Sequence, residues 1–293
     1  MILYWFNSPG HTTNSPFRYL HSPVDMRYQK FPAAPDIQSF IECYFIWEGE
    51  APDGIDVQSP PSGFSSMVFN YGDPYFASQN GNAPRQVPRA FVSGQFTSNY
   101  LLQLKGKIGM AGIVLKPTAL HNFFGLRMSE LVNSRVPLFL LPGLPEEILW
   151  TAVNGQSTDA ARIKVLEELM HSYLNVARTN LSIIDEAADY IDSCKGCVSV
   201  EAVSEHLKIS RRYLEKKFLE KVGVSPKFYA RIKRFGALSN KIAHNEKIDW
   251  QEIVVEYGFH DQSHLVKEFM EFNQMNPSQY HLLHREMTRF VKQ

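Results

Sequence analysis

The residues with the clearest chemical potential are basic side chains that gather in one window of an otherwise neutral chain. The 293 residues include 30 Lys and Arg and 30 Asp and Glu, so the formal net charge is zero. Between residues 208 and 247, however, twelve Lys and Arg residues stand against three acids, an excess of nine positive charges. An ordinary solvated helix face would interleave both signs. The window therefore favours binding to a polyanion.

Other reactive side chains occur without the partners that their chemistry needs. Cys194 and Cys197 have a spacing found in redox and metal sites, but no second Cys or His pair lies nearby, and we interpret them as reduced thiols in a turn between helices. The chain has no nucleophile elbow, phosphate-binding glycine loop or metal triad. We therefore expect no enzyme, no cofactor and no bound metal. Ordinary structural roles are expected for the scattered histidines His11, His21, His121 and His171.

The elements that must position the basic residues form an internal repeat at the end of the chain. A shift of 51 residues aligns the tail with itself without a gap. The aligned pairs are Glu201/Glu252, Val203/Val254, Glu205/Glu256, Leu214/Leu265, Lys216/Lys267, Phe218/Phe269, Glu220/Glu271, Pro226/Pro277 and Tyr229/Tyr280. Chance similarity between amphipathic helices would supply the leucines and phenylalanines, but not proline and tyrosine in register as well. A repeat of this length indicates a duplicated supersecondary unit.

The first unit is predicted to be two helices joined by a tight turn. Residues 200–207 form the short first helix, and the second runs from about 211 to 221. Ser210 is expected to be its N-cap, because a serine hydroxyl can accept a hydrogen bond from a free backbone N–H there. Gly223 follows as the expected C-terminal stop. Such a corner lets the second helix enter a major groove of a duplex while the first braces the backbone.

The second unit repeats the pattern, with residues 249–257 as the first helix and Asp261 or Ser263 as the cap of the second. Between the units, residues 226–244 are predicted to form a helix that starts with proline, which is tolerated in the first turn. At 1.5 Å per residue this linker spans roughly 28 Å. Successive major-groove openings on one face of a duplex lie about 34 Å apart. The linker therefore looks able to hold the two second helices about one turn of a duplex apart.

At this point the motifs are recognisable. Residues 258–265 (GFHDQSHL), followed by Phe269, Pro277 and Tyr280, resemble the signature of AraC/XylS-family transcription regulators. Residues 222–227 (VGVSPK) and 231–235 (RIKRF) resemble the first unit and linker of the same family. The resemblance covers roughly residues 181–284 and implies a rigid seven-helix domain that binds double-stranded promoter DNA.

The resemblance also implies roles for individual side chains. Arg and Lys can pair with guanine, and Gln with adenine. The expected base contacts come from Arg212, Glu215, Lys216, Gln262, Ser263 and Lys267. The expected phosphate contacts, which add affinity without sequence information, come from Arg211, Lys217, Lys227, Arg231, Lys233 and Arg234.

Two departures make the second unit look weaker than the first. The family usually has glycine where this chain has Gln274, and a positive φ there would strain glutamine. Around Lys267 the second unit also carries more acids. We therefore expect the first unit to contribute more of the affinity.

The first half of the chain shows a strand pattern. Aromatic and β-branched runs separated by turn formers predict a small antiparallel sheet or barrel; the runs are residues 42–47, 67–71, 90–92, 100–104 and 108–115. Residues 1–36 are expected to be an irregular lead-in. Short helices are predicted at 118–124 and 129–132, and a longer one at 160–176 that is either a packing helix or a dimer seam.

This half resembles, more distantly, the cupin-like sensor domains attached to such regulators, through residues 61–64 (PSGF), the Gly94 region and residues 112–117 (GIVLKP). It lacks a close histidine pair with a following Glu, so no cupin metal site is expected. Two functions stay open: a sensor for a small effector, or a dimerisation and protein-interaction module. The aromatic residues that could line a pocket, or simply form the core, are Tyr44, Phe45, Trp47, Phe69, Tyr71 and Tyr75.

The sequence thus predicts an α+β chain of two domains. Residues 1–178 are the β-rich, cupin-like domain with a terminal helix, and residues 179–293 are the all-α domain with two helix-turn-helix units, at about 199–222 and 249–273, and their linker. The expected partner is promoter DNA. A small effector, RNA polymerase and a second copy of the chain are candidate further partners. No membrane contact is expected, and a cytoplasmic location follows by default.

Overall fold

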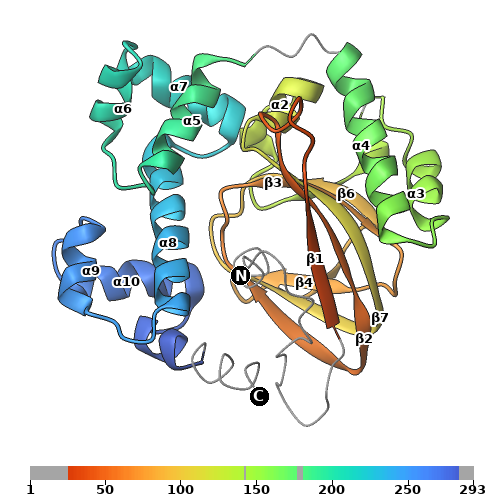
Figure 1. Cartoon of the computed structure of the whole chain (residues 1–293), viewed down its shortest axis with the longest axis horizontal. Coiled ribbons are helices and arrows are strands. Elements are labelled where there is room, and N and C mark those ends of the chain that lie inside the picture. Colours follow the sequence, from red (N-terminus) through yellow and green to blue (C-terminus); the bar gives the residue numbers. More distant parts are fainter. Residues whose placement is uncertain (1–25, 142, 177–180, 284–293) are drawn as a thin grey trace.

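The computed structural model describes residues 26–141, 143–176 and 181–283 and has two parts (Figure 1). A β-rich part with covering helices precedes an all-helical part, so the predicted fold class is confirmed. Figure 1 shows the sheet on one side, helices α3 and α4 on its outer flank, and helices α5–α10 on the other side of the molecule. No helix among the described residues is long and apolar enough to cross a membrane.

One antiparallel sheet organises the first part, with its main strands in the order β1-β2-β7-β3-β6-β8. The short strands β4 and β5 pair with each other, and β4 also pairs with β7. The strands are β1 (Met26–Pro32), β2 (Ile41–Ser59), β3 (Ser65–Asn70), β4 (Phe76–Gln79), β5 (Arg85–Gln86), β6 (Ala90–Ser93), β7 (Tyr100–Leu115) and β8 (Arg135–Pro137).

The structure corrects three details of the sequence prediction. The expected lead-in contains strand β1, while residues 1–25 lie outside the described residues. The runs 100–104 and 108–115 are one long strand, β7, which pairs with β2 along nearly its whole length. Residues 52–54 (PDG), one of the turn formers that were expected to separate the strands, lie within β2 at a register shift between Ala51 and Ile55, so they bend a continuous strand instead of separating two.

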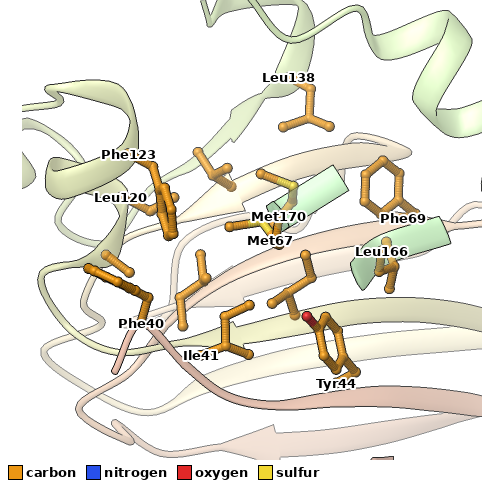
Figure 2. Close-up of a cluster of buried hydrophobic side chains, with 14 of the residues drawn as sticks. Phe40, Ile41, Tyr44, Met67, Phe69, Leu120, Phe123, Leu138, Leu166 and Met170 are labelled. Carbon is orange, nitrogen blue, oxygen red and sulfur yellow. The ribbon is translucent and has the colours of Figure 1, made fainter. Parts of the chain in front are cut away.

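Alternation along the strands divides the apolar residues between the two faces of the sheet. On one face, Tyr44 and Phe69 join a core that is closed by the helices (Figure 2). This core includes Ile163, Leu166 and Met170 of α4 (Asp159–Val176), so the apolar stripe of that helix is a packing surface for its own domain. On the other face, Phe45 and Trp47 belong to a second cluster. The other covering elements are α2 (Ala119–Phe124), η1 (Met128–Glu130), η2 (Leu138–Leu140) and α3 (Glu146–Asn154).

The helical part contains two hydrophobic clusters that meet along one long helix. Helix α8 (Pro226–His244) contributes Tyr229 and Ala230 to the first cluster and Ile232, Phe235, Leu238 and Ile242 to the second. The first cluster is completed by α5 (Ile183–Ser193), α6 (Val200–His206) and α7 (Arg211–Val222), and the second by α9 (Trp250–Glu256) and α10 (Gln262–Asn273).

The two parts are joined through the first cluster. Val132, from the β-rich part, packs against this cluster, and Gly223 at the end of α7 lies directly against the Met128 backbone. A buried carboxylate, Asp185 of α5, accepts hydrogen bonds from the side chains of Thr118 and Asn122 across the junction. Burial raises the pKa of Asp185, but these hydrogen bonds, with those from Ser182, lower it below its ordinary value. The junction therefore favours the charged carboxylate.

Candidate nucleic-acid interface

The first unit presents α7 as an exposed second helix. The Ser210 hydroxyl accepts a hydrogen bond from the Tyr213 N–H at 3.2 Å, which confirms the predicted cap. Leu214 and Phe218 are fully buried, and burying each contributes about 1.5–3 kcal/mol. Gly223 ends the helix with φ of +96°, a conformation that favours glycine. The fixed inner face determines which side chains of α7 point outward.

Three outward side chains of α7 differ in how free they are. Arg212 and Lys216 are exposed, and no carboxylate within the described ranges pairs with either. Glu215 is half-buried and accepts a hydrogen bond from Arg211 Nε at 2.9 Å. Arg211 also pairs with Glu201 of α6. Arg212 and Lys216 are therefore the cations that this helix offers to a ligand, whereas Glu215 is held by its neighbour.

The second unit has the same construction. Asp261 Oδ1 accepts a hydrogen bond from the His264 N–H at 2.7 Å, so Asp261, not Ser263, caps α10. This hydrogen bond lowers the pKa of the Asp261 carboxyl. Leu265 and Phe269 are buried at 1% exposure and match the inner pair of α7. The three predicted contact residues of this helix are all exposed: Gln262, Ser263 and Lys267.

The repeat is not gapless in the structure. The second helices, their caps and the following residues match at a shift of 51, but the first helices, Val200–His206 and Trp250–Glu256, match at a shift of 50. Buried Val203 therefore corresponds to buried Ile253 instead of half-buried Val254. The turn of the second unit has one residue more between its first helix and its cap. The sequence pairs from Glu201/Glu252 to Glu205/Glu256 reflect similar composition, not equivalent positions.

The predicted linker begins and ends as expected, at Pro226 and His244. Its basic residues, however, are placed differently from the prediction. Lys227 is exposed and unpaired within the described ranges. Lys233 is 6% exposed, pairs with Asp192 at 2.8 Å and lies 4.2 Å from the Phe64 ring of the β-rich part. In this arrangement Lys233 is a junction residue, and its ammonium is not available to a phosphate.

A buried carboxylate pairs with the other two predicted phosphate contacts of the linker, Arg231 and Arg234. Glu268 of α10 is 5% exposed and accepts hydrogen bonds from Arg231 Nε at 2.9 Å and Arg234 Nη2 at 2.7 Å. Arg231 also pairs with Glu271 at 2.5 Å. The Arg234 guanidinium lies 4.4 Å from the ring of Phe259, in the turn of the second unit. These contacts fix α10 on the linker. Sequence reasoning missed Glu268, because no local pattern distinguishes it from other helix acids.

A groove of about 660 Å³ runs between the two units over the linker. Charged residues of both signs line it: Glu201, Arg211, Lys227, Arg231, Arg234, Lys267, Glu268 and Glu271, together with His264. The free cations, Lys227 and Lys267, lie at its two sides. Two other predicted phosphate contacts are paired with carboxylates. Arg211 is exposed and pairs with Glu201, and Lys217 is half-buried and pairs with Glu220.

The β-rich part contains a separate cavity on the second face of its sheet. Its volume is about 120 Å³, and its walls include Phe45, Trp47 and Tyr75. The other three aromatic residues that the sequence singled out lie on or beside the opposite core: Tyr44, Phe69 and Tyr71. Arg135 and several serines also line the cavity. None of these polar residues was singled out from the sequence, since nothing local links β8 to this wall.

The cysteines and histidines show no constellation of reactive groups. The described residues hold no cluster of three or more potential metal ligands. Cys194 and Cys197 lie in the turn after α5, and burial raises the pKa of the Cys197 thiol. His121 and His171 bond to the backbone at Leu126 and Glu167, while His11 and His21 lie outside the described residues.

Comparison with known families agrees with this geometry. A helix-turn-helix domain model matches residues 203–282, which contain both units and the linker. This match identifies residues 203–282 as an AraC-type helix-turn-helix domain. A second model, described as a domain of unknown function (DUF6597), matches residues 29–137. None of the curated proteins compared with the chain matches it. The AraC-type domain and the two-part fold point to a DNA-binding transcription regulator.

Solved structures of similar arrangement include ToxT from Vibrio cholerae, with a TM-score of 0.45 and 13% identity over 82% of this chain and 97% of that one. The C-terminal domain of the response regulator yesN from Fusobacterium nucleatum has a TM-score of 0.31 and 24% identity over 34% and 99%. The AraC-like transcriptional activator CuxR has values of 0.31 and 14% over 72% and 84%.

Proposed function

We propose that this AraC-type regulator binds specific promoter sequences by placing α7 and α10 in successive major grooves on one face of the duplex. The observation that carries the proposal is the pair of capped, well-packed second helices, each with free polar side chains, at the two ends of one linker. A linker of this length spans roughly 28 Å, close to the ~34 Å repeat of the groove. Recognition of a particular sequence follows because α7 offers cationic side chains to the bases, while α10 offers amide, hydroxyl and cationic ones.

Within this proposal, base contacts come from Arg212 and Lys216 in the first unit and from Gln262, Ser263 and Lys267 in the second. Glu215 joins them only if Arg211 releases it, because the two are paired without DNA. Lys227 at the groove is the clearest phosphate contact. The first unit has two free cations against one in the second, which supports the expectation that α7 contributes more of the affinity.

We further propose that residues 1–178 regulate residues 179–293 in response to a small effector. The cavity on the second face of the sheet supports this role, since small-molecule sites are concave and mostly apolar with a few polar groups. The alternative, a dimerisation or protein-interaction module, has support in three exposed apolar side chains, Phe139, Leu140 and Ile148, which are 61–68% exposed. Contacts with RNA polymerase and with a second copy of the chain stay predictions.

Fluorescence anisotropy with a labelled duplex from the region upstream of the coding sequence tests the DNA-binding proposal. The expected result is affinity at least about 1,000-fold above that for a scrambled duplex at the same salt concentration. Lys227→Ala should reduce the slope of log K against log salt by about 0.9, since one phosphate contact is lost, without changing the preferred sequence. Equal affinity for the two duplexes at every salt concentration would refute specific recognition.

A further inference from the structure

The cavity in the β-rich part has an apolar side suited to a flat ring. Phe45 and Trp47 of β2, Phe91 of β6 and Tyr75 line it, and all four side chains are less than 9% exposed. Its volume of about 120 Å³ is slightly smaller than the ~150 Å³ cavity that holds benzene in an engineered protein. The dimensions therefore suit a ligand with one ring and exclude a long acyl chain or a nucleotide.

The opposite side of the cavity is polar. The hydroxyls of Ser66 and Ser93, on the neighbouring strands β3 and β6, line it and bond to each other at 2.7 Å. Alternation along β3 places Ser66 and Val68 on the cavity face, whereas the Ser65 side chain shares the opposite face with Met67. A serine hydroxyl has one donor and two acceptor sites, so the Ser66–Ser93 pair retains hydrogen-bonding capacity for a ligand oxygen at this wall.

Arg135 adds a positive charge to the same cavity. Its guanidinium stacks on the rings of Phe96 and Tyr100 at 4.6 and 4.4 Å. No carboxylate in the part of the chain that the structure describes lies within ion-pair distance, although most half-buried arginines in this protein have such a partner, as Arg231 does. Stacking holds the planar fork in place, and an arginine fork matches a carboxylate through two parallel hydrogen bonds. The stacked guanidinium at the cavity wall therefore suits a small anion.

We propose that this cavity binds a small organic acid with a single flat ring, whose carboxylate pairs with Arg135 while the ring packs against Phe45 and Trp47. A second polar group on the ring, such as a hydroxyl, would bond to the Ser66 and Ser93 hydroxyls. The inference names the chemical class of the effector for the role proposed above. Only an effect of this ligand on DNA binding rests on that role. Ligand binding itself can be measured without DNA, so the two proposals can fail separately.

Isothermal titration calorimetry of the full chain tests the assignment, with benzoate as the probe and benzamide as its neutral isostere. We expect benzoate to bind at least tenfold more tightly than benzamide. Arg135→Gln should weaken benzoate binding at least tenfold and change benzamide binding less than twofold, which also shows that the cavity is intact. Arg127→Gln is the matched control, because Arg127 is 70% exposed in the same domain and pairs only with Glu130. It should bind benzoate as the wild type does.

Three outcomes would overturn the proposal. The first is equal affinity for benzoate and benzamide, because the cavity would then not recognise the charge. The second is unchanged benzoate binding in Arg135→Gln, because the anion would then lie elsewhere. The third is no binding of benzoate, salicylate or benzamide up to millimolar concentration, because a preformed cavity of this size should admit at least one of them. Salicylate, which adds a hydroxyl beside the carboxylate, should bind more tightly than benzoate in the wild type, with the gain reduced in Ser66→Ala.

Discussion

Glu268→Gln should loosen the second helix-turn-helix unit from the linker. The substitution keeps the size of the side chain and removes the charge that pairs with Arg231 and Arg234. Removing one partner of a buried ion pair costs about 3–5 kcal/mol. The cost here is smaller, because Arg231 keeps Glu271 and the Arg234 side chain is 15% exposed. We expect a loss of about 2–3 kcal/mol in the stability of the α8–α10 contact.

Hydrogen exchange measures this loss locally in the full chain. Each 1.4 kcal/mol corresponds to a tenfold change in an equilibrium constant, so backbone amides of α10 should lose protection by roughly 30- to 150-fold. Amides of α7, in the other cluster, should change little. Glu271→Gln is the matched control: Glu271 is 51% exposed and pairs with Arg231 alone. An exposed pair contributes about 0–1 kcal/mol, so its effect should stay below about fivefold.

Comparison of the two variants tests whether burial of the Glu268 carboxylate fixes α10 on the linker. If Glu268→Gln and Glu271→Gln reduced the protection of α10 by similar amounts, burial of the Glu268 carboxylate would not be what fixes the second unit. If α7 lost protection as strongly as α10, the two units would unfold together and the pair would contribute to the stability of the whole domain instead.

Three further predictions concern both halves of the chain. Lys216→Ala should weaken binding to the target duplex about tenfold and Lys267→Ala about threefold, by anisotropy at one salt concentration. The reverse order would contradict the expectation that the first unit contributes more of the affinity for DNA. Gln274 has a φ of +57°, so Gln274→Gly should relieve about 1–2 kcal/mol of strain in the folded state. Because glycine also gives the unfolded chain more conformational freedom, the net stabilisation in urea denaturation should be about 0.5–1 kcal/mol. No rise in the midpoint would contradict this. The lowered pKa of Asp185 means that its stabilisation is full above about pH 5 and is lost as the pH falls below 3.8, through the folded pKa. The urea midpoints of the wild type and Asp185→Asn should therefore differ at neutral pH and converge as the pH falls through the folded pKa, which lies below 3.8.

Features that depend on neighbouring residues were predictable from the sequence. Ser210 was expected to cap α7 and does so, because an N-cap hydroxyl and the backbone N–H that donates to it lie within one turn of chain. The strain at Gln274 was anticipated from the family resemblance, which has glycine at this position, and the observed φ of +57° agrees with it. Leu214 and Phe218 stand four residues apart, a spacing that places both on one face of a helix, and both are buried.

Features that depend on distant residues were not predictable. Lys233 lies in a run of basic residues, and its burial is decided by Phe64, far away in the chain and in the other domain. Arg234 pairs with an acid 34 residues away. In β2, Tyr44 and Phe45 are equally apolar, and only the closed fold assigns one to the core and the other to the cavity. Charge along the sequence therefore overstated the number of cations that are free to meet DNA.

The hydrophobic cluster shared by the two halves also limits how the protein can be recombined. Because Val132 packs into the cluster around α7 and Thr118 bonds to Asp185, a fragment containing only the helical half would expose apolar surface and leave Asp185 without its hydrogen bonds from Thr118 and Asn122. A chimera that joins this β-rich part to another helix-turn-helix domain must therefore provide an apolar surface that matches Val132.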